Sequence, residues 1–302
     1  MEITILTPVY NRQYMIENLY NSLLRQTSKN FEWLIVDDGS TDNIKSWVEN
    51  VKQESPIKIR YIYQKNGGKH RALNTGISQI DSEMTFIVDS DDYIKDDAID
   101  TINKYYEKYK LDNSICGFSF LRCYPDGKIN GPKFKNDEYR SDYIKCRLNQ
   151  NIWGDKAEVY YTKCLKEYPF LEVPGEKFLV ESYVWAQLAL KYDMIHINRA
   201  IYVGNYLEDG LTSSMNKRKF DSPIGYMEKS KILCNSKANL KIKCKSMLLY
   251  TAYGLVAKKR FKELKNNIKY KTLFILLYPL GKYQYKRIKD NIKKGKISGR
   301  KK

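Results

Sequence analysis

Three carboxylates follow a short apolar stretch in the first third of the chain. The apolar residues Phe86–Val88 lead directly into Asp89, Asp91 and Asp92. Carboxylates this close repel one another, so their pKa values rise unless solvent or a cation offsets the charge. Oxygen ligands at this spacing suit Mg²⁺ or Mn²⁺, which take phosphates as further ligands. The segment therefore indicates a metal site for a diphosphate, or else a solvated acidic turn that begins the next helix.

Four apolar segments with the length of buried β-strands lie in the first hundred residues. They are Ile3–Thr7, Phe31–Val36, Ile57–Tyr63 and Met84–Asp89. Apolar residues at helical spacing separate them, as in Tyr14–Arg25. Strands that alternate with helices in this way predict a parallel sheet joined by right-handed crossovers.

Each of these strands ends in polar or glycine-rich sequence, namely Thr7–Arg12, Asp37–Asp42, Asn66–Arg71 and Asp89–Asp92. Ligands of an open parallel sheet bind beyond the carboxyl ends of its strands. Because crossovers bring these four ends to one edge, we expect a single composite site there. This expectation favours the metal site over the simple acidic turn.

The second half of the chain is less regular. We expect a strand at Ser114–Arg122, an edge strand at Ala157–Thr162, a helix from Glu181 to Lys191, and short strands at Met194–Ile197 and Ile201–Val203. From Asp221 onward the pattern predicts helices only.

The net charge of +18 comes from the C-terminal part of the 302-residue chain. Residues 235–302 hold 21 Lys and Arg against two acids, whereas residues 1–234 hold 32 against 33 acids. This distribution predicts a tail that binds an anionic surface while the chemistry takes place elsewhere.

We expect a cytoplasmic protein without a signal peptide, because Met1–Thr7 has no basic region followed by a long apolar run. The apolar run Leu273–Leu280 is far shorter than the ~20 residues that a spanning helix needs. Six cysteines without paired spacing and two histidines argue against zinc or iron–sulfur sites. The thiols are expected to be reduced.

Four motifs occur in order along the first hundred residues: Thr7–Asn11, Ile35–Asp42, Asn66–Gly68 and Asp89–Asp92. Together they resemble the family 2 glycosyltransferases with the GT-A fold, closely over residues 1–110 and less closely over 150–215. The resemblance implies an α/β fold with a Rossmann-like open twisted sheet flanked by helices. It also implies inverting transfer of a sugar from a nucleotide diphosphate to an acceptor hydroxyl, with Mn²⁺ or Mg²⁺.

The resemblance suggests how the chain is divided. Residues 1–220 form the expected GT-A domain, with a nucleotide-binding half at 1–110 and an acceptor half at 111–220. Residues 221–302 form a helical, Lys-rich C-terminal region.

The first two motifs supply the expected contacts with the nucleobase. Tyr10 can stack on the base, and Thr7 and Pro8 shape the wall beside it. Asp38 can accept the imide N–H of uracil, which points to a UDP-sugar donor.

The last two motifs supply the expected contacts with the rest of the donor. Gly67, after Asn66, lets the backbone approach a ligand, and Arg71 can face a phosphate, although a simple glycine turn is the alternative. The D-x-D pattern assigns Asp89 and Asp91 to the ribose and the metal, with Ser90 beside the donor. Asp92 is a possible further metal ligand.

Inversion needs a base that takes the proton of the acceptor hydroxyl. The resembled family supplies it from a Glu-Asp pair at the start of a helix. Glu181 occupies the second position of that pair, and Val180 replaces the first. Glu176 is the alternative base, and both acids have a helix-capping interpretation.

The tail has two interpretations. Apolar residues within Leu248–Ile268 recur at helical spacing among lysines, which suits the surface of an anionic bilayer. The alternative is a solvated helical cap on the catalytic domain. Because members of the resembled family often extend lipid-linked saccharides, we favour peripheral association with the inner face of the cell membrane and a lipid-linked saccharide acceptor.

Two other functions fit less well. A nucleotidyltransferase acting on sugar phosphates would carry a glycine-rich basic signature after the first strand, and Thr7–Arg12 contains no glycine. A non-enzymatic nucleic-acid-binding protein would spread basic residues over the whole chain, yet residues 1–234 are almost neutral. We therefore expect no specific nucleic-acid partner, and we make no prediction of the oligomeric state.

Overall fold

The computed structural model describes residues 2–204 and 215–293, and the chain forms two compact units. The first unit comprises Met1–Asp142, Ile152–Pro169 and Lys191–Asn205, and the second comprises Tyr143–Asn151, Phe170–Leu190 and Tyr206–Lys302. The units are defined by packing and interleave along the chain. The functional division expected at residue 220 stays a prediction.

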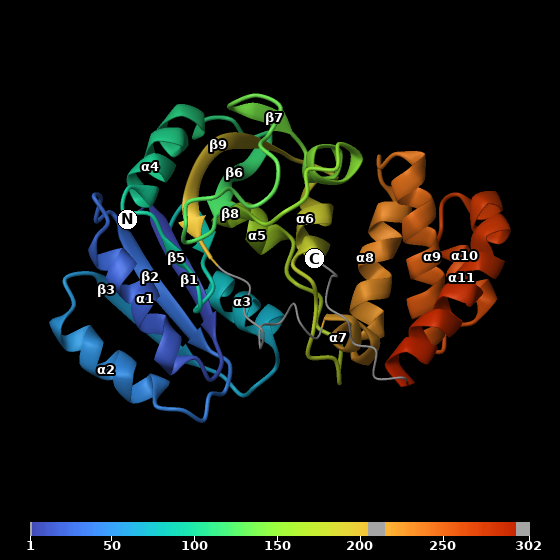
Figure 1. Ribbon diagram of the computed structural model, residues 1–302, viewed down its shortest axis with the longest axis horizontal. Coiled ribbons are helices and arrows are strands. Elements are labelled where there is room, and N and C mark those ends of the chain that lie inside the picture. The colour runs from blue at the N-terminus through green and yellow to red at the C-terminus, as the bar shows by residue number, and fades with distance from the viewer. Residues whose placement is uncertain (1, 205–214, 294–302) are drawn as a thin grey trace. The chain divides into compact units, whose positions relative to one another are not determined.

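A nine-stranded sheet forms the centre of the first unit (Figure 1). Its strands are β1 Ile3–Val9, β2 Phe31–Asp37, β3 Lys58–Tyr63, β4 Met84–Ile87, β5 Tyr93–Ile94, β6 Ile115–Cys123, β7 Tyr139–Ser141, β8 Lys156–Tyr161 and β9 Asp193–Val203. The order across the sheet is β3-β2-β1-β4-β8-β6-β9-β5, and β7 pairs with β9. The helices of this unit are α1 Gln13–Leu24, α2 Ile44–Glu54, α3 Lys69–Ser78, α4 Ala98–Tyr109 and α5 Thr162–Glu167.

The four strands β3, β2, β1 and β4 are parallel, as the sequence predicts. In their register, Leu6 is paired with both Leu34 and Ile87. Every residue of β1 and β2 is buried, which is typical of parallel strands whose two faces are both covered. Helix α3 packs on β1 and β2, and α1 packs against β5 (Figure 1).

Two predictions about the second half of the sheet were wrong. The segment Ala157–Thr162 is not an edge strand, because β8 lies between β4 and β6 and is antiparallel to both. The strands expected at Met194–Ile197 and Ile201–Val203 are one continuous strand, β9. The polar Asn198 does not end this strand, because its side chain forms two hydrogen bonds, of 2.8 and 3.1 Å, with the backbone of Phe134.

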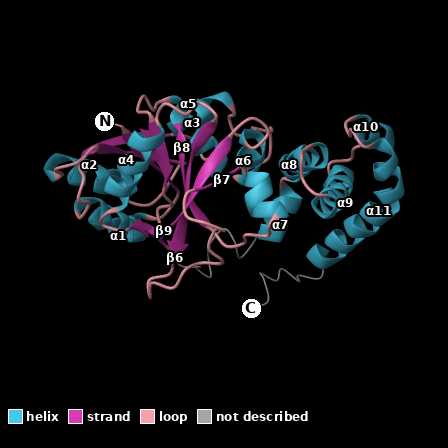
Figure 2. Ribbon diagram, turned by 90° about the horizontal axis from the view of Figure 1, so that it is seen from above, coloured by secondary structure: helices cyan, strands magenta, loops and turns pink. Residues whose placement is uncertain are grey.

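The second unit is helical in the described part of the chain (Figure 2). It contains the π-helix η1 Ile144–Asn149, and then α6 Ser182–Leu188, α7 Met215–Asp221, α8 Pro223–Asn235, α9 Leu240–Val256, α10 Phe261–Asn266 and α11 Lys271–Lys293. The prediction of helices alone from Asp221 is therefore confirmed as far as residue 293.

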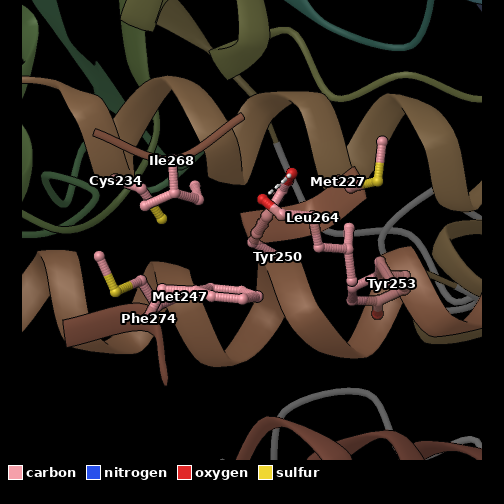
Figure 3. Packing of buried hydrophobic residues seen from close by; sticks show 8 residues of the cluster. All are labelled: Met227, Cys234, Met247, Tyr250, Tyr253, Leu264, Ile268 and Phe274. Atoms are coloured by element: carbon pink, nitrogen blue, oxygen red, sulfur yellow. Dashed lines mark hydrogen bonds between the residues drawn. The ribbon is translucent and has the colours of Figure 1, made fainter. Parts of the chain in front are cut away.

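Helix α9 is the centre of the second unit, packing against both α8 and α11. Figure 3 shows the buried cluster around it, in which the Tyr250 hydroxyl donates a hydrogen bond of 3.1 Å to the Leu264 carbonyl. Ala252, Leu264 and Ile268 are also buried. Of the apolar residues within Leu248–Ile268, for which the sequence left a bilayer surface and a helical cap as alternatives, these three belong to the core of the unit.

Among residues 2–204 and 215–293, no helix combines the length and the apolar content that crossing a bilayer requires. The polar segment Tyr206–Ser214, for which the sequence predicts a loop, lies outside the described residues.

Candidate active site

The three aspartates of the D-x-D-D segment lie together just beyond β4, at the edge where the parallel strands end. Asp89, Asp91 and Asp92 each offer an oxygen, and these oxygens all lie within 4.8 Å of one another. A group of carboxylate oxygens at this separation matches the ligands that Mg²⁺ and Mn²⁺ prefer. The residues present therefore fit a hard divalent cation.

Asp92 is the buried member of this cluster. Its Oδ2 accepts a hydrogen bond from Arg122 Nη2 at 2.8 Å and another from the Tyr202 hydroxyl at 2.7 Å. Burial and the charges of Asp89 and Asp91 raise the pKa of Asp92 to about 7, although the Arg122 guanidinium opposes this shift. Asp92 is thus anchored to β6 and β9 and holds the acidic turn in place.

Arg122 and Tyr202 are neighbours in the pairing of β6 with β9. The guanidinium carbon of Arg122 lies 4.2 Å from the centre of the Tyr202 ring, a distance at which a cation is attracted to an aromatic face. Both side chains contact Asp92, and a Cβ atom on Gly204 would overlap Arg122 and Asp92. The strand pair therefore ends in a close-packed support for the acidic turn.

Asp89 is paired with a cation from a different element. Its Oδ1 lies 2.7 Å from Nζ of Lys69, the first residue of α3. Burial alone raises the pKa of Asp89, but the Lys69 ammonium keeps it below its ordinary value. For Asp91, burial and the charge of Asp89 raise the pKa. Asp89 is therefore the more readily ionised of the two, and a bound cation would lower the pKa of Asp91.

Asp38 organises the loop between β3 and α3. Its Oδ1 accepts hydrogen bonds from the Gln64 side chain at 2.7 Å and from the Gly67 N–H at 2.8 Å. Its Oδ2 accepts from the Gly68 N–H at 2.7 Å and from the Asn66 side chain at 3.2 Å. Asp38 is only 3% exposed. The structure thus gives this carboxylate a positioning role, while its contact with a nucleobase stays a prediction.

The geometry of this loop requires glycine at Gly68, and Gly67 lies close to the side chain of Arg71. Gly68 has a φ of 98°, which other residues rarely adopt. A Cβ atom on Gly67 would lie 2.6 Å from Cδ of Arg71. The close turn that results starts α3 at Lys69, beside Asp89, and places Arg71 in the first turn of the helix.

The residues expected around the base differ in exposure. Tyr10 is 49% exposed at the end of β1, so its ring is accessible for stacking. Thr7 and Pro8 are buried, and the Thr7 hydroxyl accepts a hydrogen bond of 2.9 Å from the Trp33 indole. The backbone N–H of Asn11 donates to the Ser40 hydroxyl at 2.9 Å, which ties the end of β1 to the turn after β2.

Glu176 and Glu181 lie in the second unit and have different surroundings. Both oxygens of Glu176 accept backbone N–H bonds at the start of α8, from Ile224 at 2.7 Å and from Gly225 at 3.0 Å. Glu176 is therefore a helix-capping carboxylate. Glu181 is partly exposed immediately before α6, and its side chain does not cap that helix.

Sequence reasoning missed Lys69, Arg122 and Tyr202 as residues of the site. Lys69 directly follows the Gly67-Gly68 pair, which is a usable signal for a side chain at a ligand-binding turn. Arg122 and Tyr202 carry no such signal, because each stands in a strand and reaches the acidic turn only through strand pairing. Ser90 lies inside the turn and is 6% exposed.

Three known proteins show the relationships of the chain. It is 26% identical over 292 residues to the GalNAc(5)-diNAcBac-PP-undecaprenol beta-1,3-glucosyltransferase of Campylobacter jejuni, which covers 90% of this chain and 87% of that protein. The fold matches the crystal structure of Staphylococcus aureus TarS 1–349 in complex with UDP, with a TM-score of 0.63, 17% identity, and coverage of 98% and 92%.

A second solved structure with this fold is the mannosyltransferase PcManGT from Pyrobaculum calidifontis in complex with GDP-Man and Mn²⁺. Its TM-score is 0.56 at 15% identity, with 94% of this chain and 86% of that chain covered. Both likenesses confirm the predicted GT-A fold, with a central sheet flanked by helices.

The chain spans less than half the length of two other curated glycosyltransferases that it matches, 28% of one and 41% of the other. The family model described as Glycosyl transferase family 2 matches residues 4–161, which is more than half of the chain. The chain therefore belongs to glycosyl transferase family 2.

Proposed function

We propose that this glycosyltransferase inverts the anomeric centre of a sugar while moving it from a UDP-sugar to an acceptor hydroxyl. The observation that carries this proposal is the group of carboxylates at the carboxyl edge of the parallel strands, within 4.8 Å of one another and beside Lys69. Such an edge is where an open sheet binds its ligand. Family membership supplies the class of reaction.

The donor is held at this edge by groups from three strand ends. The exposed Tyr10 ring stacks on the uracil, with Thr7 and Pro8 forming the adjoining wall. Asp38 keeps the loop of Asn66 and Gly67 in shape and accepts the imide N–H of the uracil. Support for uridine comes from the UDP complex of TarS, a protein of the same fold.

The diphosphate lies beside the acidic turn, and Asp89 and Asp91 hold Mn²⁺ or Mg²⁺ there. A cation held by these residues would supply positive charge that offsets the charge of the leaving diphosphate. Arg71 faces a phosphate from the first turn of α3, and Ser90 lies beside the donor. The Mn²⁺ complex of PcManGT supports a divalent cation in this fold.

Glu181 takes the proton of the acceptor hydroxyl. It occupies the second position of the family's Glu-Asp pair, whereas both oxygens of Glu176 accept backbone N–H bonds at the start of α8. A base must present an oxygen that can accept a proton. These contacts favour Glu181 over Glu176.

The acceptor is a saccharide on a lipid carrier, as part of the synthesis of a cell-surface polysaccharide. The name of the Campylobacter relative describes an undecaprenol-linked acceptor, and that relative covers 90% of this chain. The protein accordingly acts at the inner face of the cell membrane as a peripheral protein.

Calorimetry and thermal shift with UDP, GDP, CDP and their sugar conjugates, each with Mn²⁺ or with EDTA, test the donor site. Ligand that binds the folded state raises the melting temperature without any acceptor present. We expect stabilisation by UDP ligands in Mn²⁺ and its loss in EDTA. Asp91→Asn is expected to lose the stabilisation by UDP ligands that depends on Mn²⁺. Asp81→Asn, at an exposed position outside the cluster, is expected to retain that stabilisation. Absence of any nucleotide response in the wild type would overturn the proposal.

A further inference from the structure

Helix α11 carries apolar residues on two of its faces. One face packs inside the second unit, where Phe274 is fully buried and Leu277 and Tyr278 contact the buried cluster around α9. Gly281 continues this face, since a Cβ atom there would lie 2.5 Å from Thr251 of α9. The inner face therefore accounts for the attachment of α11 to α9.

The other face is exposed and just as apolar. Ile275, Leu276, Leu280 and Tyr283 are 46%, 69%, 54% and 66% exposed, respectively. Three of them follow the spacing i, i+4 and i+7, so they lie along one side of the helix. Packing within the unit does not explain these large apolar side chains.

Cations border the exposed stripe. Helix α11 contains six basic residues and a single acid, Asp290. Lys271 precedes the stripe, and Lys282, Lys286 and Arg287 continue along and beyond it, all of them exposed. Long basic side chains can lie along apolar surface while their charged ends reach out to anions.

We propose that the outward face of α11 binds the surface of an anionic lipid bilayer, with the helix lying in the plane of the interface. An apolar stripe bordered by Lys and Arg has the composition of an interfacial helix, whose apolar side chains enter the headgroup boundary while the cations meet anionic lipids. Helix α11 does not have the apolar content needed to span a bilayer.

A protein partner fits this surface less well. The exposed lysines beside the apolar stripe favour a partner with dense negative charge, which an anionic bilayer supplies. The charge of residues 235–302, with 21 basic and two acidic residues, adds attraction to any anionic surface. The outward face of α11 is the surface that would serve the proposed peripheral association with the membrane. Its proposed binding to a bilayer rests on that function only for its biological purpose.

Co-sedimentation of the full chain with vesicles of phosphatidylcholine, with and without phosphatidylglycerol, tests the inference. We expect binding to the anionic vesicles, weakening with added salt. The variant Leu276→Glu/Leu280→Glu is expected to bind about tenfold or more weakly, because two apolar side chains are lost from the interface and two negative charges are added.

The matched control is Leu111→Glu/Leu240→Glu, which changes the net charge equally at positions that are 89% and 66% exposed. We expect this control to bind like the wild type. A milder variant, Lys282→Gln/Lys286→Gln, leaves the apolar stripe intact and is expected to weaken binding on the order of tenfold. This second variant tests the inference even if the glutamate pair disturbs the helix.

Binding of both α11 variants at the wild-type level would overturn the inference. A second copy of the chain as the occupant would also overturn it. In that case sedimentation equilibrium would show a wild-type dimer that the glutamate pair dissociates, without any change in vesicle binding. Because nucleotide binding is measured separately, a wild type that binds vesicles but not UDP would contradict the donor proposal and leave this inference standing.

Discussion

The hydroxyl of Tyr202 donates a hydrogen bond of 2.7 Å to Asp92. The same oxygen accepts a bond of 3.1 Å from the backbone N–H of Asp89. One side chain of β9 therefore fixes both ends of the acidic turn. Arg122 of β6 also donates a hydrogen bond to Asp92. The geometry of the candidate metal site therefore depends on the pair of strands β6 and β9, and Tyr202 lies more than 100 residues along the chain from Asp92.

We expect Tyr202→Phe to reduce stability by about 1–3 kcal/mol, because Asp92 and the Asp89 N–H each lose a buried partner. Metal-dependent UDP binding should weaken as well, since the turn is no longer held at both ends. Urea unfolding and calorimetry with Mn²⁺ measure the two effects. Tyr63→Phe, at a 60% exposed position, serves as the control. Equal behaviour of the two variants would contradict the role of Tyr202.

Asp38→Asn should disorganise the loop before α3. The amide keeps the size of the carboxylate but replaces one acceptor oxygen by a donor, which then opposes the N–H groups of the loop. We expect a loss of about 1–3 kcal/mol in the free energy of unfolding together with weaker UDP binding. Denaturant titration and calorimetry check this, with Asp81→Asn as the control. A fully stable Asp38→Asn protein would show that the loop does not depend on this carboxylate.

Glu181→Gln and Glu176→Gln should separate catalysis from stability. Glu181→Gln is expected to retain metal-dependent nucleotide binding and to lose transfer, because the amide cannot take a proton. Glu176→Gln should mainly lower stability, by about 1 kcal/mol, because the negative charge at the start of α8 is lost. Transfer assays of both variants measure the effect on catalysis, and thermal unfolding of both variants measures the effect on stability. Wild-type transfer by Glu181→Gln would assign the base to another residue.

Glu32 makes stability depend on acid pH. It is buried on β2, and its oxygens lie 2.8 Å from Lys58 Nζ and 3.0 Å from Arg60 Nη1. Burial alone raises the pKa of Glu32, but Lys58, Arg60 and the Thr4 hydroxyl together lower it from its ordinary 4.5. The charged carboxylate therefore stabilises the fold above about pH 4.5, and this contribution is lost as the pH falls through the lowered pKa.

Comparison of the wild type with Glu32→Gln tests this dependence. At pH 7 we expect the variant to be less stable by about 1–2 kcal/mol, because Lys58 and Arg60 lose a charged partner. The difference in unfolding free energy should shrink below pH 4.5. A difference that stays constant from pH 7 to pH 3 would show that the ionisation of Glu32 does not contribute.

The sequence by itself determined the parallel half of the sheet and the place of the candidate site. Apolar runs that end in Thr7–Arg12, Asp37–Asp42 or Asp89–Asp92 are local signals, because strand length and turn chemistry depend on neighbouring residues. Right-handed crossovers between such strands allow few topologies, and in a parallel sheet the polar ends of the strands lie at one edge. Asp89, Asp91 and Asp92 cluster there because they are neighbours in one of these turns.

Only the tertiary structure decided what surrounds that edge. The central position of β8, the approach of Tyr202 to Asp92 and the pairing of Lys69 with Asp89 depend on contacts between distant segments. The C-terminal helices give a second example. The apolar residues of α9 and of α11 have similar patterns in the sequence, so the sequence does not show which of them are buried. Apolar residues of α9 pack against neighbouring helices in the core of the unit, whereas Leu276 and Leu280 of α11 remain exposed. Whether a side chain is buried depends on neighbours that only the folded chain supplies, and a local sequence pattern does not specify those neighbours.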